Sequence, residues 1–200
     1  MFVVTADQRA STRDGDRVDA LTQRLVPWFS HHVDAVELPL ERTVGDEVQT
    51  VLATADAALD LALLLVRWGG WSVGVGAGPD ELLAGSARES SGPAFVAARR
   101  AVERAKVKSE PVPVIIDGTH AGASEAATAV VQLLAAIVQR RSHAGWEVAD
   151  LLSRGRSQRE AAERLEISEQ AVSQRVASAM INEERRARPV AARLIDAAGR

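Results

Sequence analysis

Hydrophobic positions from Ser157 to Met180 follow two short helices joined by a turn. Ser168 stands where the second helix would be capped, and Ala162 is small where the two helices would touch. The apolar residues recur in steps of three and four, the spacing of one helix face, and they are Ala161, Ala162, Leu165, Ile167, Val172 and Val176. This pattern predicts a helix-turn-helix, with a generic helical hairpin as the alternative.

The polar positions of the second helix point outward in this interpretation, and they are Glu169, Gln170, Ser173 and Gln174. Side chains of this size and polarity suit base edges in a DNA major groove, and Ser168 is expected to join them. Ser157, Arg159 and Arg175 are expected to lie near phosphates. Glu166 occupies a turn position where the backbone is usually left-handed and glycine is usual, so we expect a cost there.

The first 120 residues alternate between strand and helix patterns. Strands are expected over residues 2–5, 36–42, 48–53, 71–78 and 112–117, and helices from 18 to 29, 55–68 and about 93–106. Residues 44–47 predict the tight turn of a hairpin between the second and third strands. This order favours an α/β fold, an α+β sandwich of ferredoxin-like type with its helices on one face.

The remaining pattern predicts an all-α unit at the C-terminal end. Residues 125–141 predict a helix that carries the chain to this unit, and residues 146–152 its first helix. Residues 180–195 have a helical pattern that Pro189 is expected to interrupt. No strand pair follows the expected recognition helix, so no wing is predicted. The expected domains are residues 1–119, a connecting helix over 120–142, and the helix-turn-helix domain over 143–200.

Composition narrows the class of protein. The chain has 200 residues, 46% of them hydrophobic, which is enough for one or two domains with a core. It has no cysteine, which excludes disulfides and thiolate metal sites. The longest apolar run, residues 57–66, is too short to span a bilayer, and the first residues lack a charged leader. A cytoplasmic protein without a membrane partner is therefore expected.

The charge is unevenly divided between the two halves. The net charge is −3, made of −6 over residues 1–139 and +3 over residues 140–200. Contact with DNA phosphates requires basic character, and the excess falls in the segment that contains the predicted helix-turn-helix. The excess is small, so two copies are expected to bind one DNA site together.

Two acidic residues stand at neighbouring ends of predicted strands. Asp7 follows the first strand, and Asp46 lies in the hairpin turn. In a ferredoxin-like sheet the first strand lies beside one arm of that hairpin, so the two carboxylates can meet. Carboxylates there could hold magnesium against a triphosphate. The alternative is ordinary structure, because Asp often caps a following helix and Gly-Asp is common in turns.

Four short motifs, in the same order and at similar spacings, resemble the catalytic domain of class III nucleotidyl cyclases. They are Asp7 with Thr12, the Arg42–Asp46 hairpin, the Val73–Gly78 strand, and the helix containing Gly92, Ala98 and Arg100. The resemblance covers residues 2–106. With the helix-turn-helix added, the chain is similar to SatD-type proteins and related actinobacterial regulators.

The resemblance implies a role for several positions. Asp7 and Asp46 match the aspartates that carry the metals, and Arg42 falls on the base-selecting lysine. Arg100 matches the arginine that stabilises the transition-state phosphate, whereas Val96 replaces the asparagine that orients the ribose. An apolar side chain cannot make that hydrogen bond. The loop Gln8-Arg9-Ala10 also lacks the family's glycine. The resemblance therefore implies a cyclase-like fold whose catalysis is lost.

Other candidate residues carry weaker signals. His31 and His32 are interpreted as surface or capping groups, and His120 and His143 are isolated. The glycines at 74, 76 and 78 lack a following helix start, so a dinucleotide-binding loop is not expected. Trp68 and Trp71 are expected in the core or in a dimer contact.

These observations favour a sequence-specific DNA-binding transcriptional regulator that binds double-stranded DNA as a homodimer. The cyclase-like domain would serve for dimerisation and for nucleotide sensing, and the location would be cytoplasmic and nucleoid-associated. The alternative is a divergent purine nucleotide cyclase or triphosphate-binding enzyme with a DNA-binding tail, in which Asp7, Asp46 and Arg100 carry the chemistry. A third possibility keeps a nucleotide ligand without chemistry. No cofactor is expected, except Mg²⁺ if nucleotide binding is retained.

Overall fold

The computed structural model describes residues 1–79, 90–107, 110 and 112–200. Its strands are β1 (Phe2–Gln8), β2 (Val36–Arg42), β3 (Glu47–Leu52), β4 (Trp71–Ala77) and β5 (Val114–Gly118). Its helices are α1 (Ser11–Asp14), α2 (Val18–His31), the 3-10 helix η1 (Val33–Ala35), α3 (Ala55–Trp68), α4 (Pro93–Ala105), α5 (Ala121–Arg140), α6 (His143–Ser153), α7 (Gln158–Leu165), α8 (Glu169–Ser178) and α9 (Ile181–Ala198).

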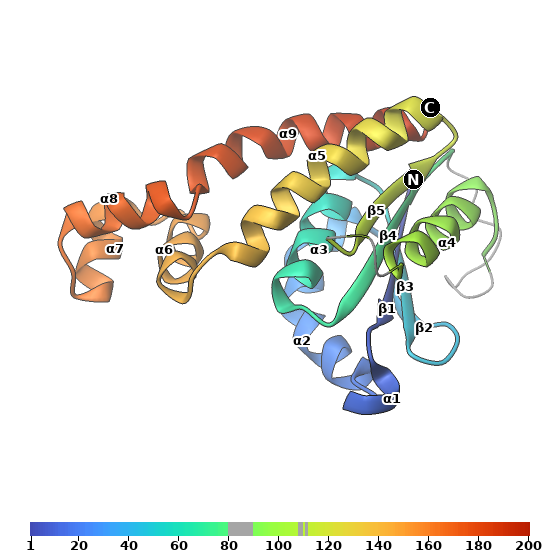
Figure 1. Cartoon of the computed structure of the whole chain (residues 1–200), viewed down its shortest axis with the longest axis horizontal. Helices are drawn as coiled ribbons and strands as arrows, with labels where there is room; N and C mark the ends of the chain where they lie inside the picture. The colour runs from blue at the N-terminus through green and yellow to red at the C-terminus, as the bar shows by residue number, and fades with distance from the viewer. Residues whose placement is uncertain (80–89, 108–109, 111) are drawn as a thin grey trace.

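A five-stranded mixed sheet lies at the centre of the first half of the chain, in the order β2-β3-β1-β4-β5 (Figure 1). The neighbouring strands are antiparallel except β4 and β5, which are parallel. In this register Asp7 on β1 lies opposite Glu47 on β3 and Ser72 on β4. The expected mixed α/β class is therefore confirmed.

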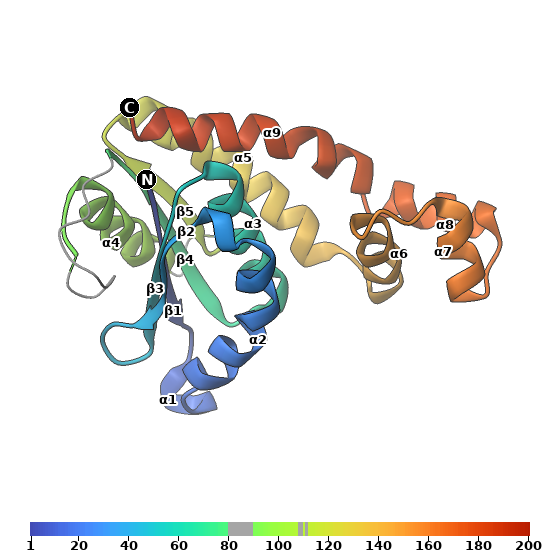
Figure 2. The same ribbon diagram turned by 180° about the vertical axis from the view of Figure 1, so that it is seen from behind.

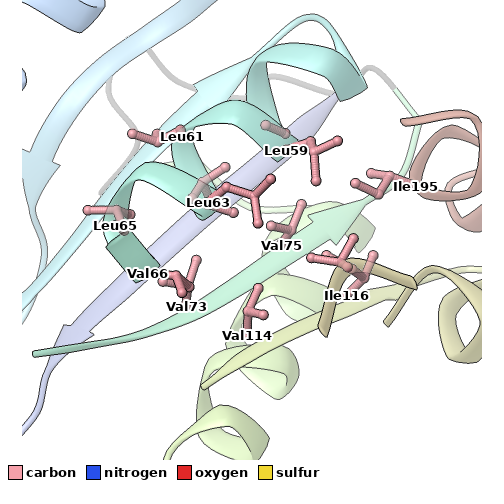
Figure 3. Close-up of a cluster of buried hydrophobic side chains, with 14 of the residues drawn as sticks. Leu59, Leu61, Leu63, Leu65, Val66, Val73, Val75, Val114, Ile116 and Ile195 are labelled. Carbon is pink, nitrogen blue, oxygen red and sulfur yellow. The ribbon is translucent and has the colours of Figure 1, made fainter. Parts of the chain in front are cut away.

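One face of the sheet carries the larger hydrophobic core. Leucines of α3 interdigitate with β4, β5 and the end of α9, as Figure 3 shows for Leu59, Leu63, Val75, Ile116 and Ile195. Every second strand residue points to this face, because side chains alternate along a strand. Helix α2 and part of α5 complete the cover. This face holds most of the buried apolar surface that stabilises the fold.

The opposite face of the sheet is covered by α4. The helix lies directly on β4 because Gly74 and Gly76 have no side chain there. A Cβ on Gly76 would lie 2.0 Å from the carbonyl oxygen of Ala94, and one on Gly74 would lie 2.3 Å from the nitrogen of Val102. These glycines therefore serve helix packing. The expectation that the helices cover one face of the sheet is wrong, because α4 packs on the other one.

Two elements differ from the sequence prediction in a physically informative way. Strand β1 continues to Gln8, so Asp7 lies within the strand, and the polar segment after it forms the short helix α1. Helix α9 runs without a break through Pro189, contrary to the expected interruption. A proline inside a helix costs about 3 kcal/mol. Glu184 before the proline and Ile195 after it are both buried, so contacts on each side of Pro189 can offset this cost.

The second half of the chain projects away from the sheet (Figures 1 and 2). We call β1–β5 with α1–α4 the body, α6–α8 (residues 143–178) the head, and the paired helices α5 and α9 the arm. Helix α5 leaves the body and α9 returns to it, where the backbone N–H of His120 donates to the carbonyl of Ala198 at 3.0 Å. The head is therefore joined to the body at both of its ends.

Helix α5 has the length and the apolar composition of a helix that could cross a membrane, with a mean hydropathy of 1.6 over an 18-residue stretch. Here it packs instead, because Ala127, Val131, Leu134 and Val138 are buried in the main core. Its opposite side is exposed, most clearly at Leu133. The exposed side also carries Glu125, Gln139 and Arg140.

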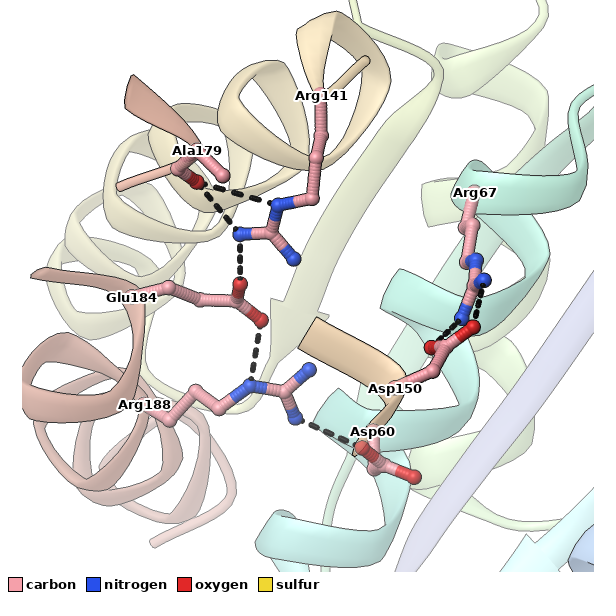
Figure 4. A network of polar contacts seen from close by, with 7 residues as sticks. All are labelled: Asp60, Arg67, Arg141, Asp150, Ala179, Glu184 and Arg188. Atoms are coloured by element: carbon pink, nitrogen blue, oxygen red, sulfur yellow. Dashed lines mark hydrogen bonds and ion pairs between the residues drawn. The ribbon is translucent and has the colours of Figure 1, made fainter. Parts of the chain in front are cut away.

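Ion pairs fix the head against the body (Figure 4). Arg67 of α3 donates to both carboxylate oxygens of Asp150 of α6, each at 2.7 Å. Arg188 of α9 donates to Asp60 of α3 at 2.7 Å and to Glu184 at 2.9 Å. Burial lowers the pKa of Arg188, but the two carboxylates outweigh burial and leave it raised. These pairs span the junction between α3, α6 and α9.

The arm meets the head at two joints, residues 141–142 between α5 and α6 and residues 179–180 between α8 and α9. One arginine connects these two joints. Arg141, at the end of α5, donates from Nε and Nη2 to the carbonyl oxygen of Ala179 at 3.1 and 3.0 Å. The same guanidinium donates to Glu184, and both of these side chains are buried. Its charge is thus compensated inside the protein, as a buried charge requires.

Candidate nucleic-acid interface and carboxylate site

The turn between α7 and α8 is built by local side-chain capping. Ser157 and Glu160 form a capping box, in which the Ser157 hydroxyl accepts from the Glu160 N–H and the Glu160 carboxylate accepts from the Ser157 N–H. The Ser168 hydroxyl caps α8 by accepting from the Ala171 N–H at 3.1 Å. Glu166 adopts φ 54° and ψ 42°, so the expected left-handed turn position is confirmed.

The head has a small hydrophobic core of its own. Val148 of α6, Ala161 and Ala162 of α7, and Val172 and Val176 of α8 are buried together. Leu165 and Ile167 pack against them at the turn. These include all the apolar positions expected on the inner face of the two helices, and α6 supplies the third side of the core.

The outer face of α8 is exposed. The four residues expected to face bases there are Glu169, Gln170, Ser173 and Gln174. Within the described residues none of these four side chains has a hydrogen bond or ion pair, so their polar groups are available to a partner. The Ser168 hydroxyl differs, because capping uses it as an acceptor and leaves its proton free to donate.

The three residues expected near phosphates have different surroundings. Arg159 is 72% exposed and lies 3.6 Å from Glu163, an open surface pair. The Ser157 hydroxyl is engaged in the capping box. Arg175 is only 29% exposed, because its Nη1 lies 3.0 Å from the Glu147 carboxylate of α6. Arg175 therefore joins α8 to α6 within the head.

The charges of the head are nearly balanced. Residues 143–178 hold five arginines and six acidic residues, so the basic excess of residues 140–200 lies outside the head. Arg154 and Arg164 are exposed, and within the described part of the chain neither has a carboxylate partner. Sequence reasoning did not single out these two. Spacing along the helix did not identify them, because Arg154 lies just after α6 and Arg164 stands four residues after Glu160, a spacing that favours an ion pair.

The carboxylate site lies at one end of β1, beneath α4. The Asp7 carboxylate faces α4 and binds Lys106 Nζ at 2.7 Å. The carbonyl of Asp46 accepts from the Gln8 N–H at 3.3 Å, so the hairpin turn lies beside the end of β1. The expected meeting of the Asp7 and Asp46 carboxylates stays a prediction. Burial lowers the pKa of Lys106, but the hydrogen bonds that it donates to Asp7 and Glu103 outweigh burial and leave the pKa raised. Lys106 is therefore a cation beside Asp7.

A second carboxylate at this site was missed from the sequence. Glu47 is buried opposite Asp7 and accepts from the Thr43 hydroxyl at 2.6 Å and from Arg99 at 2.9 Å. Ser72, on the other side of Asp7, has a buried hydroxyl that makes no hydrogen bond within the described residues. Alternation of side chains along β1 and β3 indicates which residues of each strand share a face. It does not indicate that Asp7 pairs with Glu47, because the register between the strands is not visible in the sequence.

The remaining positions of the cyclase resemblance are held by other contacts. Arg42 binds Asp16 and the Gly45 carbonyl, and its hydrogen bond lowers the pKa of Asp16. Arg100 donates to Asp117 at 2.8 Å. Val96 is 56% exposed on α4. The resemblance assigns Asp7 to a metal, Arg42 to the base and Arg100 to a phosphate. Each of these three residues is instead paired with an oppositely charged side chain of this chain.

The loop after β1 is closed by Gln8. Its amide donates to the Gly15 carbonyl at 2.6 Å, and its oxygen accepts from the Arg17 N–H at 2.8 Å. Ala10 adopts φ 59°, the left-handed region that glycine prefers. The exposed Thr12 follows in α1. The Gln8 side chain thus fills the inside of the loop, where the resemblance expects backbone amides to meet phosphate.

The four histidines have structural surroundings. His31 is the last residue of α2 and His32 follows it. Each ring contacts the backbone carbonyl four residues earlier, that of Pro27 for His31 and that of Trp28 for His32. His120 caps α5 by accepting from the Ala123 N–H at 3.1 Å. His143 is exposed on α6. Within residues 1–79, 90–107, 110 and 112–200, no group of three His, Asp or Glu side chains is placed to hold a metal.

No protein-family model, curated protein or solved structure matches this chain. What the head and the body can do is therefore inferred from their residues and geometry.

Proposed function

We propose that the protein binds double-stranded DNA sequence-specifically, with α8 as a recognition helix in the major groove, and acts as a transcriptional regulator. One observation carries this proposal: the exposed face of α8 presents Gln170, Ser173 and Gln174, whose polar groups have no partner within the described residues. Buried polar groups need partners, but exposed and unpartnered amides can donate to and accept from base edges. The capped turn before α8 holds them in a fixed orientation.

The same geometry suggests which residues meet phosphates. Arg159 lies in the first turn of α7, where a helix N-terminus also favours an anion. Arg154 and Arg164 are exposed nearby and lack carboxylate partners in the described part of the chain. Arg175 is proposed to act through position, since its bond to Glu147 sets the angle of α8 on α6.

Balanced charge in the head makes a single head a weak binder. Non-specific affinity comes mainly from the release of counterions by cationic side chains, and few are free here. We therefore propose that two copies bind one symmetric site, since two linked heads gain affinity without new contacts. The expected nucleotide-cyclase-like dimerisation of the body belongs to the same proposal.

The body supports the cyclase-like part of the proposal through its topology. The segment β1-α2-β2-β3-α3-β4 has the sheet order β2-β3-β1-β4 with antiparallel neighbours, which is the order of a ferredoxin-like sandwich. Helix α4 on the second face and the parallel strand β5 are additions to it. We propose a catalytically degenerate body, because Asp7 and Arg100 have partners within the chain.

Selection from a random duplex library, followed by binding measurements on the selected site, tests the DNA proposal. Gln174→Ala should lose about 1–3 kcal/mol on the selected site and little on random duplex. Arg159→Ala should weaken both equally and reduce the salt slope by about 1. Gln139→Ala is the matched control, because Gln139 is an exposed glutamine on α5 outside the head.

Two outcomes would overturn the proposal. One is a library that yields no enriched sequence. The other is an enriched site on which Gln174→Ala and Gln139→Ala bind alike.

The second candidate function is a divergent purine nucleotide cyclase or triphosphate-binding enzyme. The bond between the Gln8 N–H and the Asp46 carbonyl favours it, because it brings the chain around Asp7 and Asp46 together. Incubation with Mg²⁺ or Mn²⁺ and each nucleoside triphosphate, followed by product analysis, tests this candidate. If the protein turns over a nucleotide and Asp46→Ala abolishes this turnover, the body is an active enzyme and the proposal of a degenerate body is wrong.

A further inference from the structure

A cavity of about 430 Å³ lies between the body and the head. Its walls come from α2 and α3 of the body, from α6 of the head, and from the ends of α5 and α9 that face each other at the arm's joints. The volume falls in the range that holds small-molecule ligands, about 300–1,000 Å³. The carboxylates and guanidiniums of Figure 4 stand along it.

The walls of the cavity combine apolar side chains with one indole. Leu63, Leu64, Leu152 and Ile181 supply aliphatic surface, and Trp146 supplies an aromatic ring. The guanidiniums of Arg67 and Arg141 already lie over this ring, at 3.6 and 4.4 Å from its centroid. The aliphatic side chains are therefore the surface that remains for a flat organic molecule, and Trp146 offers its indole N–H.

The hydrogen-bond acceptors along the cavity are already used. Asp60 accepts from Arg188 and from the Trp28 indole, and Asp150 accepts twice from Arg67. Glu184 accepts from Arg188 and Arg141. Each of the six carboxylate oxygens that line the cavity thus already holds a hydrogen bond, and little acceptor capacity remains for a cationic ligand.

The donors along the cavity are not all used. Among the described residues the indole N–H of half-buried Trp146, the exposed Arg185 guanidinium and the exposed Asn182 amide line the cavity without a hydrogen bond or ion pair within the protein. The lining carries four arginines against three carboxylates, and Arg185 is the arginine left without a carboxylate. Water can reach these donors at the open rim, so an occupant that displaces this water has to bring acceptors, and a negative charge complements Arg185.

From the unused donors and the apolar walls, we propose that this cavity is a binding site for a small aromatic carboxylate. The ring lies against the leucines and Ile181, and the carboxylate accepts from Arg185 and from the Trp146 indole N–H. Hydrogen bonds between a guanidinium and a carboxylate are among the strongest available in proteins. The site is separate from the outer face of α8 and from the Asp7 site, and it does not depend on DNA binding.

Calorimetry of the full chain with 2-naphthoate tests the proposal, with 2-naphthylmethanol as the uncharged probe and 2-naphthylmethylamine as the cationic one. Naphthoate should bind, and the two other probes should bind at least about tenfold more weakly, since they lack the anion. Equal binding of the three probes, or no binding of naphthoate, would overturn the proposal.

Variants locate the site. Arg185→Ala should weaken naphthoate about tenfold or more, whereas Arg186→Ala should leave it within about twofold. Arg186 is the matched control, because it is the next residue on α9, is exposed like Arg185, pairs with Glu183 and does not line the cavity. Ser153→Trp should fill the cavity from its exposed rim and abolish binding while the melting temperature stays unchanged. Equal losses in the two arginine variants, or full binding by a folded Ser153→Trp, would contradict the site.

The indole N–H signals of the four tryptophans give an independent readout by nitrogen-15 NMR. The Trp146 signal should move on addition of naphthoate, because its N–H gains an acceptor. The Trp68 and Trp71 signals should stay in place, because these residues lie outside the cavity. A shift at Trp71 and none at Trp146 would place the ligand elsewhere and overturn the assignment.

Discussion

The guanidinium of Arg67 and the carboxylate of Asp150 join α3 of the body to α6 of the head through two parallel hydrogen bonds of 2.7 Å. The same guanidinium stacks on Trp146, three residues beyond the start of α6. A guanidinium that binds a carboxylate through two hydrogen bonds and also stacks on an indole restrains both the position and the angle of α6 relative to α3. This pair therefore fixes how the head meets the body.

A double-mutant cycle should measure this relationship. With Arg67→Ala and Asp150→Ala, we expect a coupling free energy of about 1 kcal/mol in chemical unfolding. The exposed pair Arg186–Glu183, three residues apart on α9, should couple by only about 0.3 kcal/mol. Equal coupling in the two cycles would show that the junction pair adds nothing beyond an ordinary surface pair.

The left-handed backbone at Glu166 predicts a stabilising substitution. Glu166→Gly should raise the free energy of unfolding by about 0.5–1 kcal/mol, because a Cβ is unfavourable at φ 54°. Glu163→Gly, in the exposed interior of α7, should lower it by about 1 kcal/mol. Thermal unfolding followed by circular dichroism checks both. The explanation fails if Glu166→Gly and Glu163→Gly shift the midpoint in the same direction.

Contact between α4 and β4 predicts a large cost at Gly76. In Gly76→Ala the new Cβ would lie 2.0 Å from the Ala94 carbonyl, so α4 must move and the free energy of unfolding should fall by roughly 3 kcal/mol. Gly122→Ala is the control, because its Cβ would meet only His120 at 3.6 Å. There alanine should be neutral or stabilise α5 by up to about 1 kcal/mol. Urea unfolding that ranks the two variants the other way would refute this packing.

The capping box predicts an acid-sensitive contribution to head stability. The backbone N–H of Ser157, then its hydroxyl and Arg156, hold the pKa of Glu160 below its ordinary value of 4.5. A carboxyl with a lowered folded pKa stabilises fully above its unfolded pKa and loses that contribution as pH falls through the folded value. Melting temperatures of the native chain and of Glu160→Gln should therefore differ by a constant amount above pH 4.5. This difference should close at lower pH, and a gap that persists in acid would exclude the carboxylate as its source.

Local patterns predicted the local elements well. The helix over 55–68 begins and ends where the sequence placed it, because Thr54 caps it and Gly69 ends it. The hairpin of β2 and β3 and the inner face of α7 and α8 follow the periodicity of their residues. These features depend on neighbours within a few positions, which is the range that a single sequence reports.

Long-range relationships were beyond the reach of the pattern. Nothing in the sequence of α4 says which face of the sheet it covers, and the contact depends on two glycines about 20 residues earlier. The pairing of Arg175 with Glu147 joins residues 28 positions apart, so the arginine could not be told from a free phosphate-binding one. The exposure of Gln174 was predicted, and its contact with a base remains a prediction.

The joints at Arg141 and Met180 restrict how the head can move. A domain on a single linker can twist as well as swing, whereas a segment held only at two adjacent points keeps one easy rotation, about the line through them. The bond from Arg141 to the Ala179 carbonyl joins these two points. The Arg67–Asp150 pair is a third attachment and opposes the remaining rotation. With that pair removed, a single cut in α5 or α9 would leave the head attached but free to twist. Loss of angular order, measured by fluorescence anisotropy of a label on the head, would precede any loss of the head itself.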